Sequence, residues 1–282
     1  MFTRGAKRLA LASSVLALLA GVTYAQQEWR PWGRGYGWSR MPPRFPTQDS
    51  FDGSFNFCRV MYQSVRREES GMGWWTDYPS ADINFSIRLS ELTKANVSFD
   101  RTGEPNHLVV RLTDDALYQC PFVLMEDVGT VGLSDLEIER FRDYLVKGGF
   151  LWVDDFWGTR AWEMWEREIA KVLPPTEYPI VDLGEDHPLF KTLFEVDHVP
   201  QVPHIQFWRQ SGHKTSERGR DSENVHVRGI SDHDGRLMVL MTHNTDIADS
   251  WEREGEESEY FYSFSIDGYA VAINALMYAM TH

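Results

Sequence analysis

Cysteine is scarce in this sequence, and the serine-hydrolase motif is absent from it. Only Cys58 and Cys120 occur among the 282 residues, and they do not form a C-x-x-C pair. This excludes the usual cysteine-based zinc and redox motifs. The two residues either form one disulfide or remain as small core residues, and their spacing leaves both alternatives open. No G-x-S-x-G sequence is present, which argues against a serine hydrolase.

Basic residues are few relative to acidic ones. The chain has 28 Lys and Arg against 42 Asp and Glu, which gives a formal net charge of −14. Binding to nucleic acid depends on Lys and Arg at phosphates, so this balance argues against a nucleic-acid partner. It argues equally against association with an anionic membrane surface.

Long apolar runs are missing outside the N-terminus. Three basic residues within the first eight positions precede an apolar segment at residues 9–21, and Thr23-Tyr24-Ala25 follows. This pattern is typical of a secretory signal peptide, here residues 1–25, cleaved after Ala25. The apolar segment is shorter than the roughly 20 residues of a membrane span, which argues against an uncleaved anchor. The sequence therefore predicts a periplasmic or secreted protein with no stable membrane span after cleavage.

The next segment, residues 26–53, differs in composition from the rest of the chain. Residues 29–38 are rich in Gly, Arg and aromatics, and prolines follow at positions 42, 43 and 46. Because the segment lacks periodicity, we expect a flexible arm. An arm that binds a partner protein is the alternative. Residues 54–282 have the length of one α/β domain.

Apolar patterns within 54–282 alternate between strands and helices. Long apolar strands are predicted at 55–62, 121–127 and 150–156. Amphipathic helices are predicted between and after them, at 80–93, 134–147 and 159–173. Shorter strands are predicted at 97–99, 108–112, 180–183, 204–209, 225–230 and 237–242, and a buried helix at 269–280. Ser80 and Ser134 are the expected N-caps of the first two helices. This order predicts an α/β fold with a mostly parallel central sheet covered on both faces.

Two of the predicted strands end in acidic residues. Glu126 ends one strand, and Asp154 and Asp155 end the next. Ligands of open α/β sheets bind beyond the carboxyl ends of the strands, so these side chains are candidate ligand-binding residues. The adjacent acids would bind a cation such as Mg²⁺ or Ca²⁺ or act as an acid/base pair. The structural alternative is that one caps the next helix and the other pairs with an arginine.

Aromatic residues frame an acid in the loop after the first strand. Asp77 lies between Trp75 and Tyr78. An acid between aromatic rings suits a sugar or another ring-bearing ligand. The alternative is a purely structural loop whose aromatic side chains pack beneath it and whose Pro79 sets the start of the helix.

A further group of polar residues follows the predicted strand at 237–242. His243 and Asp246, together with Asp249, offer nitrogen and oxygen ligands for a metal. Their spacing matches no established zinc motif. Hydrogen-bonded loop residues, with Asp246 as an N-cap, are the alternative.

A set of short motifs resembles one bacterial protein family. The motifs are Phe55-Asn56-Phe57, Trp74-Trp75-Thr76-Asp77-Tyr78-Pro79-Ser80-Ala81-Asp82, Arg88-Leu89, Glu91-Leu92-Thr93, Pro121-Phe122, Leu133-Ser134, Gly148-Gly149-Phe150, Asp154-Asp155-Phe156, His187-Pro188-Leu189-Phe190, Trp251-Glu252 and Tyr278-Ala279-Met280-Thr281-His282. Together they resemble the domain of unknown function 4159. The resemblance implies a flavodoxin-like three-layer sandwich, similar to the class I glutamine amidotransferase-like superfamily. It implies no reaction.

The resemblance also locates the position of a missing nucleophile. A glutamine amidotransferase needs a Cys on a sharp turn between a strand and a helix. If Gly158 is the glycine two residues after that position, Phe156 stands where the Cys would be. The sequence therefore favours a non-catalytic module of the cell envelope that binds a small molecule or a protein. A metal-assisted hydrolase that uses the carboxylates with His243 is the alternative, and a divalent cation is the only cofactor suggested.

Overall fold

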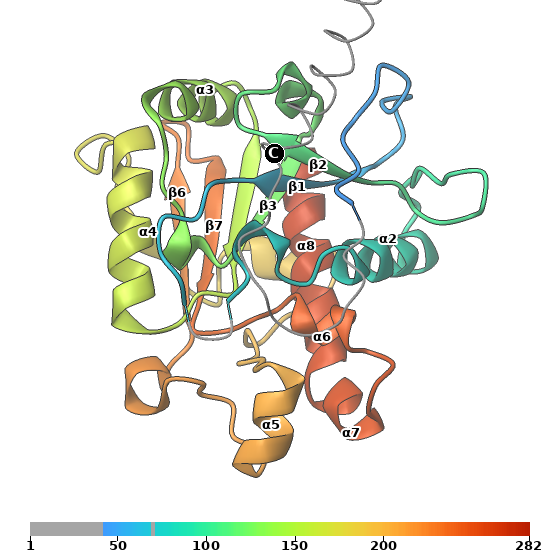
Figure 1. Cartoon of the computed structure of the whole chain (residues 1–282), viewed down its shortest axis with the longest axis vertical. Coiled ribbons are helices and arrows are strands. Elements are labelled where there is room, and N and C mark those ends of the chain that lie inside the picture. Colours follow the sequence, from blue (N-terminus) through green and yellow to red (C-terminus); the bar gives the residue numbers. More distant parts are fainter. Residues whose placement is uncertain (1–41, 69–70) are drawn as a thin grey trace, which may run out of the picture. The chain divides into compact units, whose positions relative to one another are not determined.

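A seven-stranded mixed sheet forms the centre of the fold (Figure 1). The computed structural model describes residues 42–68 and 71–282. The strand order is β2-β1-β3-β4-β7-β6-β5. The strands are β1 (Phe57–Met61), β2 (His107–Arg111), β3 (Phe122–Glu126), β4 (Phe150–Asp154), β5 (Val181–Asp182), β6 (His226–Ser231) and β7 (Leu237–His243). The strands β1, β2, β3, β4 and β7 pair in parallel, whereas β5 and β6 are antiparallel additions at one edge.

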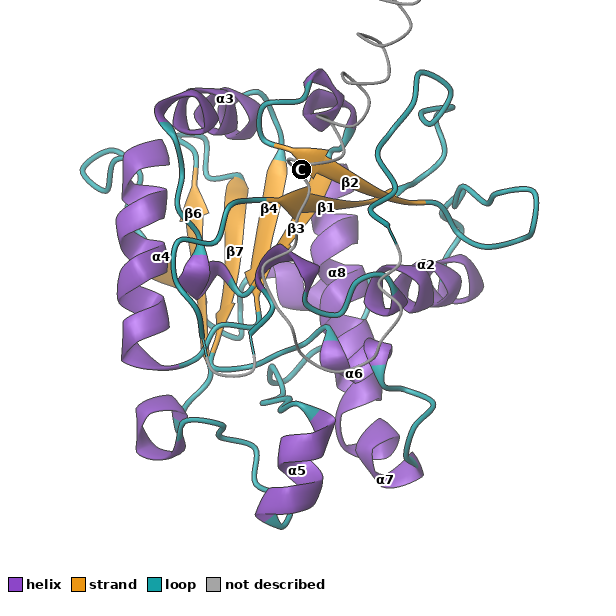
Figure 2. Cartoon of the chain, in the orientation of Figure 1, coloured by secondary structure: helices purple, strands orange, loops and turns teal. Residues whose placement is uncertain are grey.

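Helices cover both faces of this sheet (Figure 2). The helices are α2 (Ser80–Leu92), α3 (Asp135–Val146), α4 (Gly158–Val172), α5 (Ile205–Ser211), α6 (Asp249–Glu252), α7 (Ser258–Tyr260) and α8 (Ile266–Thr281). Buried residues of α2, α5, α6 and α8 share one core cluster with one face of the strands. Those of α3 and α4 share a second cluster with the other face. The predicted α/β architecture with a mostly parallel central sheet is therefore confirmed.

The central strands are apolar on both sides because both sides are covered. In β3 and β4, side chains alternate between the two core clusters: Leu124 and Trp152 belong to one, and Met125 and Val153 to the other. All of these side chains are at most 1% exposed. Burying each such side chain contributes about 1.5–3 kcal/mol to folding.

Local sequence signals explain where α3 begins. Ser134 caps the helix in the predicted capping box, in which its side chain accepts from the Glu137 backbone N–H. The Glu137 carboxylate in turn accepts from the Ser134 N–H at 2.8 Å. This prediction is confirmed. The corresponding prediction for α2 is wrong, because Pro79 is the N-cap and Ser80 is already the first helical residue, with no side-chain cap.

Two of the predicted short strands are wrong. Residues 204–209 alternate in polarity, yet they lie largely within helix α5. Here the His204 ring accepts from the Gln206 N–H at 3.2 Å, and Gly212 ends the helix with a left-handed φ of 73°. Tertiary burial of Ile205 and Trp208 on one side of the helix outweighs the weak local strand preference. Residues 97–99 make only isolated bridges, to Phe55 and Pro105.

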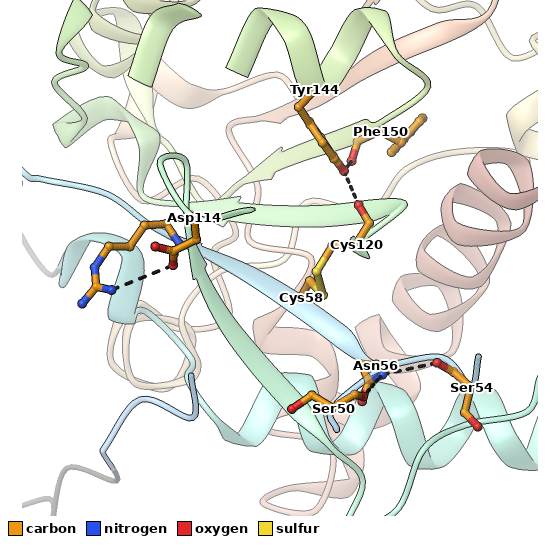
Figure 3. The surroundings of a disulfide bond; sticks show 9 residues. Ser50, Ser54, Asn56, Cys58, Asp114, Cys120, Tyr144 and Phe150 are labelled. Carbon is orange, nitrogen blue, oxygen red and sulfur yellow. Dashed lines mark hydrogen bonds and ion pairs between the residues drawn. A yellow bond between two sulfur atoms is a disulfide. The ribbon is translucent and has the colours of Figure 1, made fainter. Parts of the chain in front are cut away.

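The two cysteines form a disulfide between β1 and the residue that precedes β3 by two positions (Figure 3). The Cα atoms of Cys58 and Cys120 are 6.1 Å apart. The Tyr144 hydroxyl of α3 donates to the Cys120 carbonyl at 2.8 Å and contacts the Phe150 carbonyl at 3.2 Å. The disulfide closes a sequence separation of 62 residues. Closing a loop of this length stabilises the fold by about 4 kcal/mol in the chain-entropy model.

The end of the segment that was expected to be an arm packs against the fold. Arg44 bonds Asn106 at 3.0 Å and Glu104 at 3.1 Å, and its backbone N–H donates to the Tyr78 hydroxyl at 3.0 Å. Residues 42–53 therefore belong with the α/β unit. The predicted signal peptide and residues 26–41 lie outside the described residues. Among the described helices, none has the length and apolar character of a membrane span.

Candidate functional site

The carboxyl ends of the parallel strands carry an unusual backbone conformation. Asp77, Asp127, Asp155 and Asn244 lie in the loops after β1, β3, β4 and β7, with φ of 61°, 49°, 48° and 66°. They are four of the five non-glycine residues with positive φ in the described part of the chain. Asp and Asn tolerate this left-handed region best. Polar side chains at this edge are therefore held in specific, constrained positions.

Three buried carboxylates meet at this edge. Asp77 precedes α2, Asp246 lies in the loop between β7 and α6, and Asp249 is the first residue of α6. One oxygen from each carboxylate lies within 4.8 Å of the other two. The three residues are only 6%, 3% and 0% exposed. We call these three residues the acidic cluster. Among the described residues, their carboxylate oxygens lie close enough together to hold a metal ion.

The acidic cluster is only partly satisfied by hydrogen bonds. Asp246 Oδ1 accepts from the Asp249 N–H at 2.9 Å. Asp77 Oδ2 and Asp249 Oδ2 are buried and accept no hydrogen bond from the described residues. A buried carboxylate oxygen without a donor costs stability, because it has lost its water and gained no partner.

One arginine lies beside the acidic cluster. Arg253 Nε is 3.4 Å from Asp249 Oδ1 and 2.6 Å from the Glu252 carboxylate. Burial, reinforced by the charge of Asp249, raises the pKa of Asp77 to about 7. Burial also raises the pKa of Asp249 to about 6. That of Glu252 rises to about 11 because burial is joined by the charges of Asp77 and Asp249. These raised pKa values reflect acids that are buried close to one another.

A second group of buried charges lies nearby on β1, β3 and α2. Arg59 Nε donates to both Asp82 oxygens, at 3.1 and 3.2 Å, and its Nη1 pairs with Glu126 and donates to the Thr76 carbonyl at 2.8 Å. Arg59, Asp82 and Glu126 are 0% exposed. We call these three residues the arginine triad. The predicted site residue Glu126 thus already has a cation within the fold, although its Oε1 has no partner among the described residues.

Asp154 and Asp155 have different surroundings. Asp154 accepts from the Thr242 hydroxyl at 2.5 Å and from the Ala248 N–H at 3.0 Å. It therefore fixes the loop that carries Asp246 and Asp249. Asp155 is half-buried and accepts from the Trp157 ring N–H at 2.9 Å. Burial and the charges of Asp127 and Asp77 raise the pKa of Asp155 well above its usual range.

His243 lies on the other face of the sheet. Its ring stacks against Phe156, with centroids 4.9 Å apart, and contacts the ring of Trp162 at 5.3 Å. Its Nε2 is 3.1 Å from the Gly158 carbonyl oxygen. Burial lowers the pKa of His243 to about 4. The structure does not bring His243 together with the acidic cluster.

Trp75 forms part of an aromatic group beside Asp77. Its ring contacts Trp74 and Tyr78, at centroid distances of 4.7 and 5.5 Å. Tyr78 packs in turn on His107 at 5.5 Å. Trp75 remains half-buried. A partly accessible indole thus lies two residues before Asp77 in the chain.

Sequence reasoning missed three charged residues of this edge: Arg59, Glu252 and Arg253. Arg59 is the one charged residue in the apolar strand Phe57–Met61. A charge in such a strand signals a buried partner. Glu252 appears in the sequence only as part of the motif Trp251-Glu252, and no local pattern indicates its partial burial.

Residues 56–280 match one family model, described as a domain of unknown function, DUF4159. The chain belongs to the DUF4159 family. The predicted family is therefore confirmed. A comparison with curated proteins gave no match.

In this DUF4159 domain, Phe156 occupies the turn between β4 and α4. Its side chain is 0% exposed. Gly158 has a φ of 78°, and a Cβ there would lie 2.4 Å from the Asp221 carboxylate. Asp221 accepts from the Thr159 N–H at 3.0 Å and so caps the start of α4. The turn between β4 and α4 thus holds a core phenylalanine, and a carboxylate of the same chain closes the start of α4.

Proposed function

We propose that this DUF4159 protein is an exported, non-catalytic binding module of the cell envelope. Its ligand site is the carboxyl edge of the sheet, centred on Asp77 and bordered by Trp75 and Asp155. The observation that carries this proposal is the gathering of buried carboxylates with free oxygens at this edge. Such groups destabilise a fold unless they serve a ligand.

Two features support export. The N-terminal residues have the basic, apolar and small-residue pattern of a secretory signal. The Cys58–Cys120 disulfide is of a kind that persists in oxidising compartments such as the periplasm. Both features are expected of a protein that acts outside the cytoplasm.

A binding role is favoured over a hydrolase by the contents of the site. Phe156 has no group that can attack a substrate. His243, which the hydrolase hypothesis used together with the carboxylates, packs between aromatic rings on the other face of the sheet. The half-buried Trp75 next to Asp77 instead suits a ring-bearing small molecule, since a ring can stack on an indole while a carboxylate accepts from its hydroxyl groups.

Export is tested by expressing the full chain in a bacterium with a periplasm and separating the compartments. We expect the protein in the periplasmic fraction, shortened by the length of the leader, with both cysteines protected from a maleimide reagent. A full-length cytoplasmic protein with two reactive thiols would contradict export.

Binding is tested by following amide NMR signals while soluble cell-wall glycan fragments are added as the probe. We expect shifts confined to the carboxyl edge, and their loss in Trp75→Ala. Turnover is assayed in parallel with p-nitrophenyl acetate, phosphate and β-glucoside in the presence of Mg²⁺, Mn²⁺ or Zn²⁺. Hydrolysis of any of these substrates that is lost in an Asp77 variant would refute the binding module and support the hydrolase.

A further inference from the structure

We propose that Asp77, Asp246 and Asp249 form a binding site for one hard divalent cation, Ca²⁺ or Mg²⁺. This inference rests on the proposed function, because it assigns one component of the ligand bound at the same edge. The acidic cluster joins two segments that are distant in sequence, the loop before α2 and the segment that leads from β7 into the first residue of α6.

The spacing of the carboxylates fits a single ion. One oxygen from each of the three residues lies within 4.8 Å of the others. Two oxygens that bind the same Ca²⁺ at 2.3–2.6 Å are separated by at most about 5 Å. The three oxygens therefore need no large rearrangement to share one cation.

Unpartnered oxygens give independent support. Asp77 Oδ2 and Asp249 Oδ2 are buried and lack a hydrogen-bond donor among the described residues. Asp77 and Asp249 are 6% and 0% exposed, so bulk water does not replace the missing donors. A cation in the cluster would satisfy both oxygens at once.

The local charge balance points the same way. The three carboxylates lie beside one arginine, Arg253, whose Nε is 3.4 Å from Asp249 Oδ1 and which also contacts Glu252. Arg59 is bonded to Asp82 and Glu126, and its charge only partly opposes the rise in the pKa of Asp77. A divalent cation would neutralise most of the remaining charge.

The chemistry of the ligands selects the type of ion. All three side chains in the cluster are carboxylates, and neither His nor Cys belongs to it. Hard oxygen ligands favour Ca²⁺ and Mg²⁺, whereas zinc sites are usually built from Cys and His. The Asp154 hydrogen bond to the Ala248 N–H, at 3.0 Å, holds the loop that supplies two of the ligands.

The test is calorimetric titration of the full chain, after removal of metals with EDTA, by CaCl₂ and separately by MgCl₂. We expect one ion per chain and a rise in melting temperature. Asp77→Asn and Asp249→Asn should each weaken binding about tenfold or more, since each removes one charged ligand. Asn tolerates the left-handed backbone at position 77, and a cooperative melt confirms that each variant folds.

The double variant Glu257→Gln/Glu259→Gln is the matched control. It removes two charges from the neighbouring exposed acidic run and leaves the cluster intact. It should bind the cation as the natural protein does. Binding lost in this control but kept in Asp77→Asn would place the ion on the acidic run and overturn the inference. If neither Ca²⁺ nor Mg²⁺ binds, the inference is also overturned, because protons alone then neutralise the cluster.

Failure of the cation site and failure of the proposed function are distinguishable. If the ions bind at the cluster but glycan fragments never perturb the edge, the cation site stands and the organic ligand is refuted. If glycan fragments perturb the edge without any ion binding, the proposed function stands and the cation site is refuted.

Discussion

Two groups of buried acids lie at the same edge of this sheet, and they differ in the source of positive charge. In the arginine triad, Arg59 lies between Asp82 and Glu126 and bonds both. In the acidic cluster, no such central cation lies among Asp77, Asp246 and Asp249 in the part of the chain that the structure describes, and two of their oxygens have no donor there. Both groups are almost completely buried.

The two groups differ in whether the fold itself supplies a bonded counter-charge to the buried acids. Burying a charged group is costly unless a counter-charge and hydrogen bonds accompany it. The triad carries its counter-charge on β1, where Arg59 bonds both acids, although Glu126 Oε1 has no partner among the described residues. The cluster has the same burial without that compensation, so its counter-charge has to come from protons or from a bound cation.

The largest expected effect comes from removing the cation of the triad. Arg59→Met leaves Asp82 and Glu126 buried without a partner, and should lower the free energy of unfolding by about 3–5 kcal/mol. Chemical denaturation measures this, and added Ca²⁺ should not restore it. The triple variant Arg59→Met/Asp82→Asn/Glu126→Gln should recover most of the loss, because no uncompensated charge remains. An Arg59→Met protein within about 1 kcal/mol of the natural stability would contradict the structural role of the triad.

Burial affects a histidine at the same edge in the opposite direction: it raises the pKa of the buried acids but lowers that of His243. The pKa of His243 is lowered from 6.5 to about 4, chiefly by burial. Between these two values the unfolded chain binds a proton that the folded chain does not, so stability falls as pH drops from 6.5 towards 4. The loss attributable to His243 should reach about 3 kcal/mol. The groups facing its ring are His226 and Arg228 of β6, Asp221, Phe156 and Trp162.

The measurement for His243 compares stability against pH in the natural protein and in His243→Phe, both free of metal. Phe retains the ring stacking with Phe156 and removes the proton. The difference between the two curves should follow the titration of one group, and an NMR titration of the ring should give a pKa near 4. A ring that titrates near its ordinary value of about 6.5 would show that the packing around His243 is looser than described.

Neutralising an acid of the cluster should have the reverse effect to disrupting the triad. Without metal, Asp77→Asn should raise the free energy of unfolding by about 1–2 kcal/mol, because it removes one of several like charges buried together. With saturating Ca²⁺ the order should reverse, since the natural protein gains binding energy that the variant lacks. Thermal melts at the two conditions measure both effects. Destabilisation of the metal-free protein by Asp77→Asn would make the cluster a structural element like the triad.

The smallest expected effect concerns an exposed acid at this edge. Asp221 bonds the Thr159 N–H at 3.0 Å and the Thr159 hydroxyl at 2.5 Å. Asp221→Ala removes this cap and should cost about 1 kcal/mol. Cation binding should remain unchanged, as measured by the same titration. If Asp221→Ala weakened cation binding as much as Asp77→Asn does, Asp221 and the acidic cluster would form one coupled network. The distinction between the cluster and the other acids of this edge would then be wrong.

Much of the fold could be predicted from local patterns. Continuous apolar runs indicated β3, β4 and β7, and a hydroxyl–carboxylate pair indicated the start of α3. The helix α5 was mistaken for a strand, because seven residues are too few to show helical periodicity against an alternating background. Its conformation depends on burial of Ile205 and Trp208, which the sequence does not reveal.

The site could be predicted only in part. Acids at the ends of β3, β4 and β7 indicated the edge, since parallel strands end on the same side. Which residues contact one another at that edge depends on which face of the sheet each side chain points to. His243 and Thr242 are adjacent, yet His243 packs with Phe156 on one face and Thr242 bonds Trp152 on the other. Successive side chains of a strand point to opposite faces, which separates these two residues. This holds only while both belong to the strand, and sequence patterns locate the ends of strands poorly.

The most direct test of the central claim is a crystal structure of the full chain grown with Mn²⁺, an oxygen-seeking ion with a strong anomalous signal. The account predicts one anomalous peak within bonding distance of Asp77, Asp246 and Asp249, absent from crystals of Asp77→Asn. A peak on the exposed run that contains Glu257 and Glu259, or no peak at the cluster, would contradict it.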